Sequence, residues 1–263
     1  MSILADLKTL YHLTLHPVRG RTHAERMESF YGGQAEGYDA FRKRLLQGRE
    51  ELFGQLDVPE GGVWVDLGGG TGANLEFLGE RIHRLAKVYV VDLAPSLLEV
   101  AARRAKDRGW MNVEPVEADA TTFRPPTNGA AQGGADVVTC SYSLTMIPDW
   151  FAAVENAAAM LRPGGQIGVV DFYVSRKHPA EGLRRHGALT RWFWPAWFST
   201  DNVFPSADHL PLLRRHFETT HLAEHKAKVP YMPLCRVPYY TFVGTLPSAG
   251  TRGETASAGQ SRR

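Results

Sequence analysis

Short strand-like runs alternate with helical patterns through the middle of this 263-residue chain. Between these runs, apolar residues recur at helical spacing, and strands that alternate with helices predict an α/β fold with a mostly parallel sheet. Two later runs would close the sheet, with the last strand pairing antiparallel at its edge. The predicted strands are residues 63–65, 86–92, 113–119, 136–142, 166–172, 217–224 and 238–244.

A glycine-rich turn follows the first predicted strand, with glycine at four of the five positions 68–72, and a helical pattern opens at Ala73. Glycine is needed where the backbone takes positive φ, and a side chain there would keep a ligand away from the backbone and the helix N-terminus. Taken alone, Gly68, Gly70 and Ala73 with Asp92 downstream also satisfy a dinucleotide fingerprint. Asp66 favours a cation or an amine, because a carboxylate there would repel a pyrophosphate.

Composition sets the broad class. The content of 43% hydrophobic and 22% charged residues is ordinary for a globular protein, and a net charge of +2 does not call for nucleic acid as a partner. No apolar run is long enough to span a bilayer and the N-terminus lacks a signal-peptide core, so we expect a cytoplasmic protein. Cys140 and Cys235 are too far apart for a CxxC framework, and we expect Cys140 to be a small buried hydrophobe.

The chain is long enough for one α/β domain with an insertion. Residues 1–16 have apolar positions at roughly helical spacing, which fits a helix packed on the domain or one lying at a membrane surface. Residues 173–209 are rich in aromatics without clean periodicity, and we interpret them as a substrate insertion whose aromatics could equally form a small core of their own. Residues 246–263 are predicted to be disordered.

The run Asp66 to Gly72 (DLGGGTG) resembles the first motif of class I S-adenosyl-L-methionine (SAM) methyltransferases, and Leu161 to Gly165 (LRPGG) is common in the same class. The resemblance implies a Rossmann-like, seven-stranded sheet whose last strand is antiparallel, with residues 1–55 as a helical lid over a core of residues 56–245. Asp92 would accept hydrogen bonds from both ribose hydroxyls, and Asp119 and Ala120 would contact adenine. The implied cofactor-binding residues are Tyr38, Arg49, Asp66, Gly68, Gly70, Gly72, Asp92, Leu93, Asp119, Ala120 and Ser141.

Three further stretches are similar to the methyltransferases that trimethylate diacylglyceryl-homoserine to a betaine lipid. They begin at Phe30 (FYGGQAEGYDAFRKRLLQGRE), Arg191 (RWFWPAWFSTDNVFPSADHLPLLRRHFET) and Val229 (VPYMPLCRVPYYTFVG). The resemblance implies three N-methylations of a lipid headgroup, with S-adenosyl-L-homocysteine (SAH) as product, and peripheral contact with the inner face of a membrane. It implies neither a metal nor a nucleic acid, and it does not fix the oligomeric state.

Candidate residues for that chemistry are aromatic or basic. Aromatic faces can follow the positive charge from sulfonium to amine, and a cation can hold the homoserine carboxylate. The candidates next to the methyl group are Tyr31 and Tyr142. The substrate candidates are Arg44, Trp192, Trp194, Trp197, Arg236 and Tyr239, with Arg49 as a further carboxylate anchor. No residue is assigned as general base.

Other functions stay open at this point. One is a SAM methyltransferase for phosphatidylethanolamine or for a ubiquinone or menaquinone precursor. Another is a nicotinamide-dependent oxidoreductase. In that class the glycine motif is expected nearer the N-terminus, and Asp66 would have no role. A SAM-binding regulator without catalytic activity is disfavoured by the insertion.

Overall fold

The structure is a computed structural model that describes Thr22, Glu25 and residues 45–126, 134–199, 202–229 and 232–248. Most of the predicted N-terminal lid and the C-terminal tail lie outside these residues. The described elements, in order, are α4 (Arg49–Gln55), β1 (Val63–Leu67), η1 (Ala73–Arg84), β2 (Lys87–Asp92), α5 (Pro95–Asp107), β3 (Val113–Glu117), β4 (Ala135–Ser141), α6 (Trp150–Met160), β5 (Leu161–Phe172), α7 (Ala188–Phe198), α8 (His209–His216), β6 (Glu218–Val229) and β7 (Met232–Thr245).

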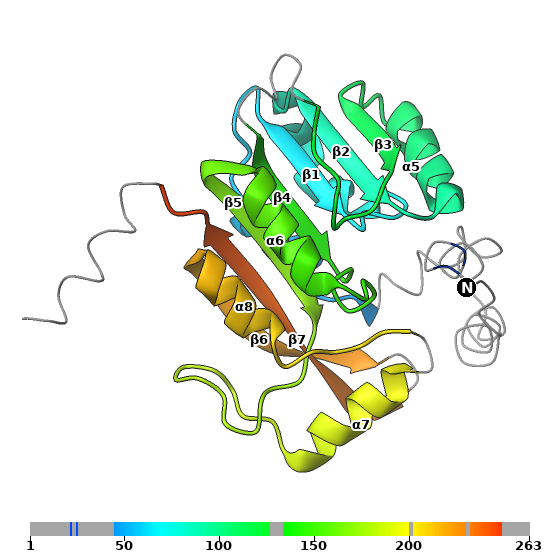
Figure 1. The fold of residues 1–263 in the computed structure, drawn as a ribbon. Helices are drawn as coiled ribbons and strands as arrows, with labels where there is room; N and C mark the ends of the chain where they lie inside the picture. Colours follow the sequence, from blue (N-terminus) through cyan, green and yellow to red (C-terminus); the bar gives the residue numbers. More distant parts are fainter. Residues whose placement is uncertain are drawn as a thin grey trace, which may run out of the picture.

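One seven-stranded sheet carries the fold, in the order β3-β2-β1-β4-β5-β7-β6 (Figure 1). The first five strands in this order are parallel, and β7 pairs antiparallel with both β5 and β6. The α/β class and the antiparallel last strand are confirmed. The predicted edge position is wrong, because β7 lies inside the sheet and the more polar β6 forms the edge.

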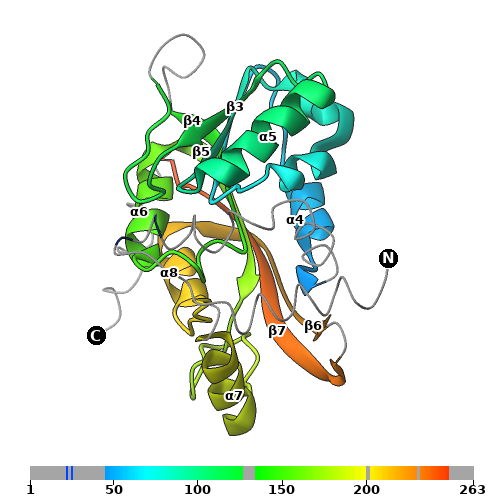
Figure 2. The ribbon, with the colours of Figure 1, turned by 90° about the vertical axis from the view of Figure 1, so that its right-hand side faces the viewer.

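Helices cover both faces of the sheet. Side chains of α4, η1 and α5 share a hydrophobic cluster on one face, and those of α6 and α8 share a second cluster on the other. Figure 2 shows α4 on one side of the sheet and α6 and α8 on the opposite side. All five residues of β1 are buried, with Trp64 in the first cluster and Val63, Val65 and Leu67 in the second. Burial on both faces explains why the inner strands read as continuous apolar runs.

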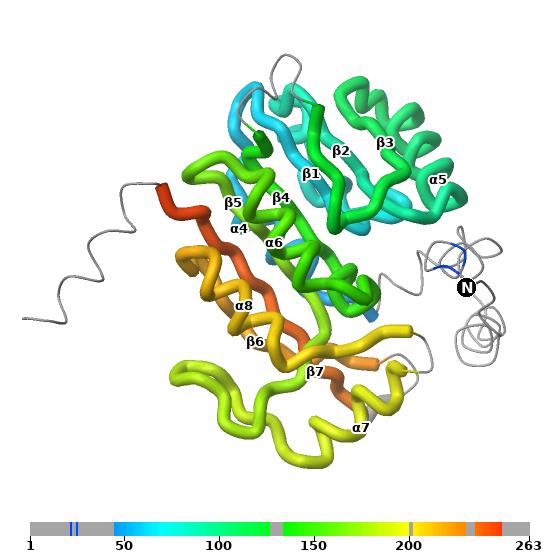
Figure 3. Tube along the Cα trace, viewed as in Figure 1, coloured from blue at the N-terminus to red at the C-terminus, as the bar shows by residue number. Residues whose placement is uncertain are grey.

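One local prediction needs correction, and one helix was not predicted. The segment after the glycine turn is a 3₁₀-helix rather than a regular α-helix, and Gly79 interrupts it with φ 54° and ψ −139°. The insertion 173–209, which lacked clean periodicity, contains the 11-residue helix α7. This helix projects from the end of the molecule that lies beyond the carboxyl end of β5 (Figures 1 and 3).

Other local predictions are confirmed. The Asp149 side chain caps α6 by accepting a hydrogen bond from the Ala152 N–H at 3.1 Å. Cys140 is fully buried in β4. None of the helices within the described residues is long and apolar enough to cross a membrane.

Candidate active site

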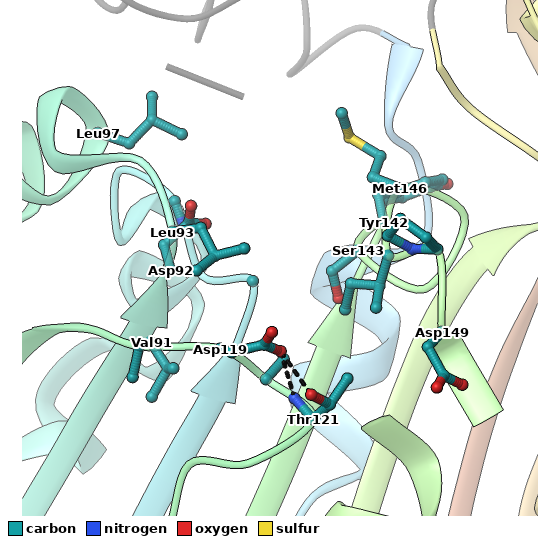
Figure 4. Close-up of a pocket in the computed structure, with 16 residues that line it drawn as sticks. Val91, Asp92, Leu93, Leu97, Asp119, Thr121, Tyr142, Ser143, Met146 and Asp149 are labelled. Atoms are coloured by element: carbon teal, nitrogen blue, oxygen red, sulfur yellow. Dashed lines mark hydrogen bonds between the residues drawn. The ribbon is translucent and has the colours of Figure 1, made fainter. Parts of the chain in front are cut away.

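A cleft opens at the carboxyl ends of β1, β2, β3 and β4 (Figure 4). It lies where the strand order reverses between β1 and β4, which is where open α/β sheets bind ligands. Residues after β2 and β3 form one side, and the segment 142–149 after β4 forms the other. The cleft is lined by six of the predicted cofactor-binding residues, namely Gly68, Gly70, Asp92, Leu93, Asp119 and Ala120, and by the predicted catalytic Tyr142.

The glycine turn is closely packed against its surroundings. Gly68 has φ +67°, and a Cβ built there would lie 2.4 Å from the Cβ of Ser143, across the cleft floor. Its N–H donates to the Val91 carbonyl at 2.8 Å, which ties the turn to β2. Gly70 and Gly72 also have positive φ. The turn therefore presents bare backbone to the cleft, as a ligand that lies against it requires.

Asp92 is held in place by backbone groups on both sides. Its Oδ2 accepts from the Gly70 N–H at 2.9 Å, and its Oδ1 accepts from the Ala94 N–H at 3.0 Å. An ionised carboxylate only accepts hydrogen bonds, at about four sites on its two oxygens. A carboxylate that lines the cleft at the end of β2 suits the two hydroxyls of a vicinal diol such as that of ribose.

The segment after β3 is ordered by side chains. Asp119 Oδ1 accepts from both the N–H and the hydroxyl of Thr121, each at 2.8 Å (Figure 4). The buried Asn156 of α6 donates through Nδ2 to the carbonyls of Ala120 and Phe123, at 2.8 and 3.0 Å. Sequence reasoning missed Asn156, although a polar side chain on the alanine-rich, inward face of a predicted helix was a signal.

Asp66 lies beneath the glycine turn and is not one of the residues that line the cleft. Its fully buried carboxylate accepts from the Thr139 hydroxyl at 2.7 Å and from Asn74 Nδ2 at 3.3 Å. Burial raises the pKa of Asp66 to about 6. Asn74 in turn accepts from the buried Arg49 at 3.2 Å. Asp66 and Arg49 thus belong to one polar network that supports the turn, and direct contact of either with a cofactor stays a prediction.

Asp171, at the end of β5, is a second buried acid that sequence reasoning missed. It accepts from the hydroxyl and the N–H of Thr145, at 2.7 and 3.1 Å, and so fixes the segment that follows β4. Burial raises the pKa of Asp171 to about 7. Its sequence signal was its place in the fifth strand-like run, because Asp66 and Asp92 occupy similar places in the first and second.

Tyr142 forms an apolar wall rather than an acid or base. Its hydroxyl donates to the Gln47 carbonyl at 2.6 Å, and burial holds its pKa well above the usual range. The ring lies 4.6 Å from that of Phe172, which stacks on Phe198 of α7 at 4.9 Å. Its φ of 54° is rare for a residue other than glycine, and such strain is concentrated at functional sites.

Ser141, the residue before Tyr142, is a predicted cofactor-binding residue. It is buried, with its hydroxyl 3.5 Å from Asn74 Oδ1.

The predicted substrate residues do not converge on one point. Trp194 is 4% exposed and packs on Phe198, whereas Trp192 is 69% and Trp197 is 38% exposed. In a helix, positions 192 and 194 point about 200° apart, so these three side chains do not form one ammonium cage. Tyr239 stacks on His225, and Arg236 is exposed on β7. Tyr31, Tyr38 and Arg44 lie outside the described residues.

Comparison with known proteins agrees with this geometry. Residues 65–165 match the family described as methyltransferase domain. The ubiquinone/menaquinone biosynthesis C-methyltransferase of Shewanella halifaxensis is 24% identical over 173 residues, which cover 64% of this chain and 67% of that protein. The 2-phytyl-1,4-naphthoquinone methyltransferase of Thermosynechococcus vestitus is 28% identical over 182 residues, covering 66% and 72%.

A solved structure of a proposed methyltransferase from Bacillus halodurans superimposes with a TM-score of 0.60 at 17% identity, covering 76% of this chain and 99% of that one. The curated relatives match over only about two thirds of their own length. The bare glycine turn, the Asp92 carboxylate and the Asp119 segment fit the amino-acid, ribose and adenine parts of SAM. The chain therefore has the class I fold of SAM-dependent methyltransferases, and its residues 65–165 match the methyltransferase domain family.

Proposed function

We propose that this chain transfers the methyl group of SAM to a lipid-soluble acceptor. The observation that carries the proposal is the row of packed rings that runs from Tyr142, in the cleft wall, through Phe172 and Phe198 to Trp194 on α7. These rings are buried, and Tyr142 presents the inner end of the row to the cleft. An apolar, aromatic wall at the methyl-transfer position suits an acceptor with a long hydrocarbon portion.

When bound, SAM supplies an electrophilic methyl group on a sulfonium. The chain then has to align the acceptor and exclude water. Tyr142 is positioned for alignment, because its hydroxyl is fixed by Gln47 and its ring by Phe172. Met146, Ile147 and Pro148 add an apolar cover on the same side of the cleft. The acceptor gains the methyl group and releases its proton to solvent.

The acceptor class favoured by the relatives is a reduced quinone that is methylated on a ring carbon. Both relatives described above are quinone methyltransferases by name. A quinol ring could stack against the Tyr142 wall, and its apolar tail could lie along Met146, Ile147 and Pro148. This acceptor takes the place of the betaine-lipid headgroup as the first candidate.

The second acceptor is the amine of diacylglyceryl-homoserine. It is supported by the betaine-lipid resemblance of the stretches that begin at Arg191 and Val229, both outside the matched residues 65–165. These two stretches form α7 and β7, which lie next to the aromatic row. Neither of the two described candidates for the carboxylate anchor supports this acceptor. Arg49 donates to Asn74, and Arg236 is exposed.

Methyl-labelled SAM distinguishes the acceptors. The purified chain would be offered a prenylated naphthoquinol, diacylglyceryl-homoserine or water-soluble phosphoethanolamine, the lipids in detergent micelles. Label on the quinol ring would support the first acceptor, and label on the lipid amine the second. Label on phosphoethanolamine alone, or on none of the three while SAH binds, would contradict a lipid-soluble acceptor.

A further inference from the structure

We infer that α7 and the basic segment before it form a docking surface for a membrane that carries anionic lipid. The inference does not depend on the proposed function, since a protein can dock on lipid whatever it methylates. It also does not depend on the predicted helix in residues 1–16, which lies outside the described residues. In the following, the docking surface means residues 176–198.

The outer face of α7 is entirely apolar. Its members are Ala188, Leu189, Trp192, Phe193, Ala196 and Trp197, which helical geometry places on one half of the helix, while Trp194 and Phe198 pack inward. Leu189 is 73% exposed. Of the six large hydrophobic side chains exposed in the described residues, three lie on this single helix of 11 residues. Such a face on a protein surface marks a binding site rather than scattered apolar exposure.

The segment before α7 supplies positive charge. Residues 176–187 contain four Arg or Lys and one Glu, although the whole chain has a net charge of only +2. Lys177, Arg184 and Arg185 are exposed, and only Arg176 has a carboxylate partner, Asp208 at 2.6 Å, among the ion pairs of the described residues. Exposed tryptophan and leucine next to basic side chains are the composition of helices that lie in the interface of an anionic bilayer.

Charge also favours lipid over a second copy of this chain. A symmetric dimer through α7 would bring two basic segments together, and like charges at an interface disfavour association. Figures 1 and 2 both show α7 and the segment before it at the same end of the molecule. That end lies beyond the carboxyl end of β5, next to the aromatic row that begins at Tyr142. A membrane at α7 would therefore lie at the end from which a lipid-soluble acceptor could reach the cleft.

The test is sedimentation of the full chain with vesicles, without SAM. Vesicles of phosphatidylcholine with about one quarter phosphatidylglycerol would be compared with pure phosphatidylcholine. The double variant Leu189→Ser/Trp192→Ser removes two exposed side chains without disturbing the core. Met111→Ser is the matched control, because Met111 is 93% exposed and lies before β3, at the opposite edge of the sheet.

We expect the wild type and Met111→Ser to bind the anionic vesicles alike, and the double variant to bind at least tenfold more weakly, since two large apolar side chains no longer enter the bilayer. Arg184→Ala/Arg185→Ala should reduce binding mainly at low salt. Unchanged SAH binding verifies that each variant is folded. Equal vesicle binding by the double variant, no binding by the wild type, or a wild-type dimer that the double variant dissociates would each overturn the inference.

Discussion

At the scale of single residues, the cleft depends on how closely the backbone at Gly68 approaches Ser143. Positive φ alone does not make a glycine indispensable, since an L residue there costs about 1–2 kcal/mol. The 2.4 Å between a built Cβ and the Cβ of Ser143 is far below a tolerable contact. This second effect separates Gly68 from the glycines whose positive φ is combined with open space, such as Gly61 and Gly79.

Gly61 offers the matched comparison, because it has the same φ of +67° and nothing within 4 Å of a built Cβ. We expect Gly61→Ala to lower the free energy of unfolding by about 1–2 kcal/mol and to leave SAH affinity unchanged. Gly68→Ala should lower stability further and abolish SAH binding, because the turn must shift. Chemical denaturation and calorimetry measure both. Equal behaviour of the two variants would show that the packing at Ser143 is unimportant.

Buried acids give the stability a pH dependence. The folded pKa of Asp171, about 7, lies above its ordinary value of 3.8, so the native state holds a proton that the unfolded chain releases between these values. Its contribution is full below pH 4 and is lost as the pH rises through 7. At about 1.4 kcal/mol per pKa unit, this amounts to roughly 4 kcal/mol as an upper limit.

Asp171→Asn should therefore flatten the decline in the free energy of unfolding between pH 5 and 8, whatever its effect on absolute stability. Urea denaturation at several pH values measures the slope. Asp107→Asn, which removes an exposed carboxylate on α5, serves as the control. A slope that is the same in Asp171→Asn and in the wild type would rule out Asp171 as its source.

At the scale of elements, α6 orders the adenine side of the cleft through one side chain. Asn156 bridges the carbonyls of Ala120 and Phe123 from the buried face of the helix. Asn156→Ala should cost about 1–3 kcal/mol of stability, because two buried carbonyls lose their partner. It should also weaken SAH binding several-fold, as the segment after β3 loosens. The exposed neighbour Glu155→Ala should leave both quantities unchanged, and a loss of affinity in both variants alike would refute the role of Asn156.

The elements also differ in how well the sequence predicted them. The inner strands and the ends of β1, β2 and β3 followed from apolar runs and from the acids beside them, and these ends form the cleft. The helix α7 was not predicted, because its apolar side chains point both inward and outward and so hide the helical period. The order of β6 and β7 could have been predicted from their composition. The apolar run PYYTFVG lies in β7, which is buried on both faces, whereas β6 is polar, as is typical of an edge strand.

At the scale of the whole molecule, two surfaces meet at one end of the sheet. The cleft occupies the carboxyl ends of the parallel strands, and the docking surface projects beyond β5. The cofactor side could be predicted from the sequence because it consists of backbone turns and acids at fixed places in a repeated strand–helix pattern. The acceptor side could not, because it depends on how α7 packs against Phe172, and that contact joins residues distant in the chain.

The measurement that tests the central claim most directly is calorimetric titration of SAH into the wild type and Asp92→Asn. Asp92 lines the cleft at the end of β2, where a carboxylate can accept from a ribose diol, and an amide in its place has no charge and fewer acceptors. A hydrogen bond to a charged group is worth about 1.5–3 kcal/mol, so we predict that SAH binds the wild type and binds Asp92→Asn roughly 10- to 150-fold more weakly. The exposed Glu99→Gln on α5 should bind like the wild type. No binding by the wild type, or equal binding by Asp92→Asn, would contradict the assignment of the cleft.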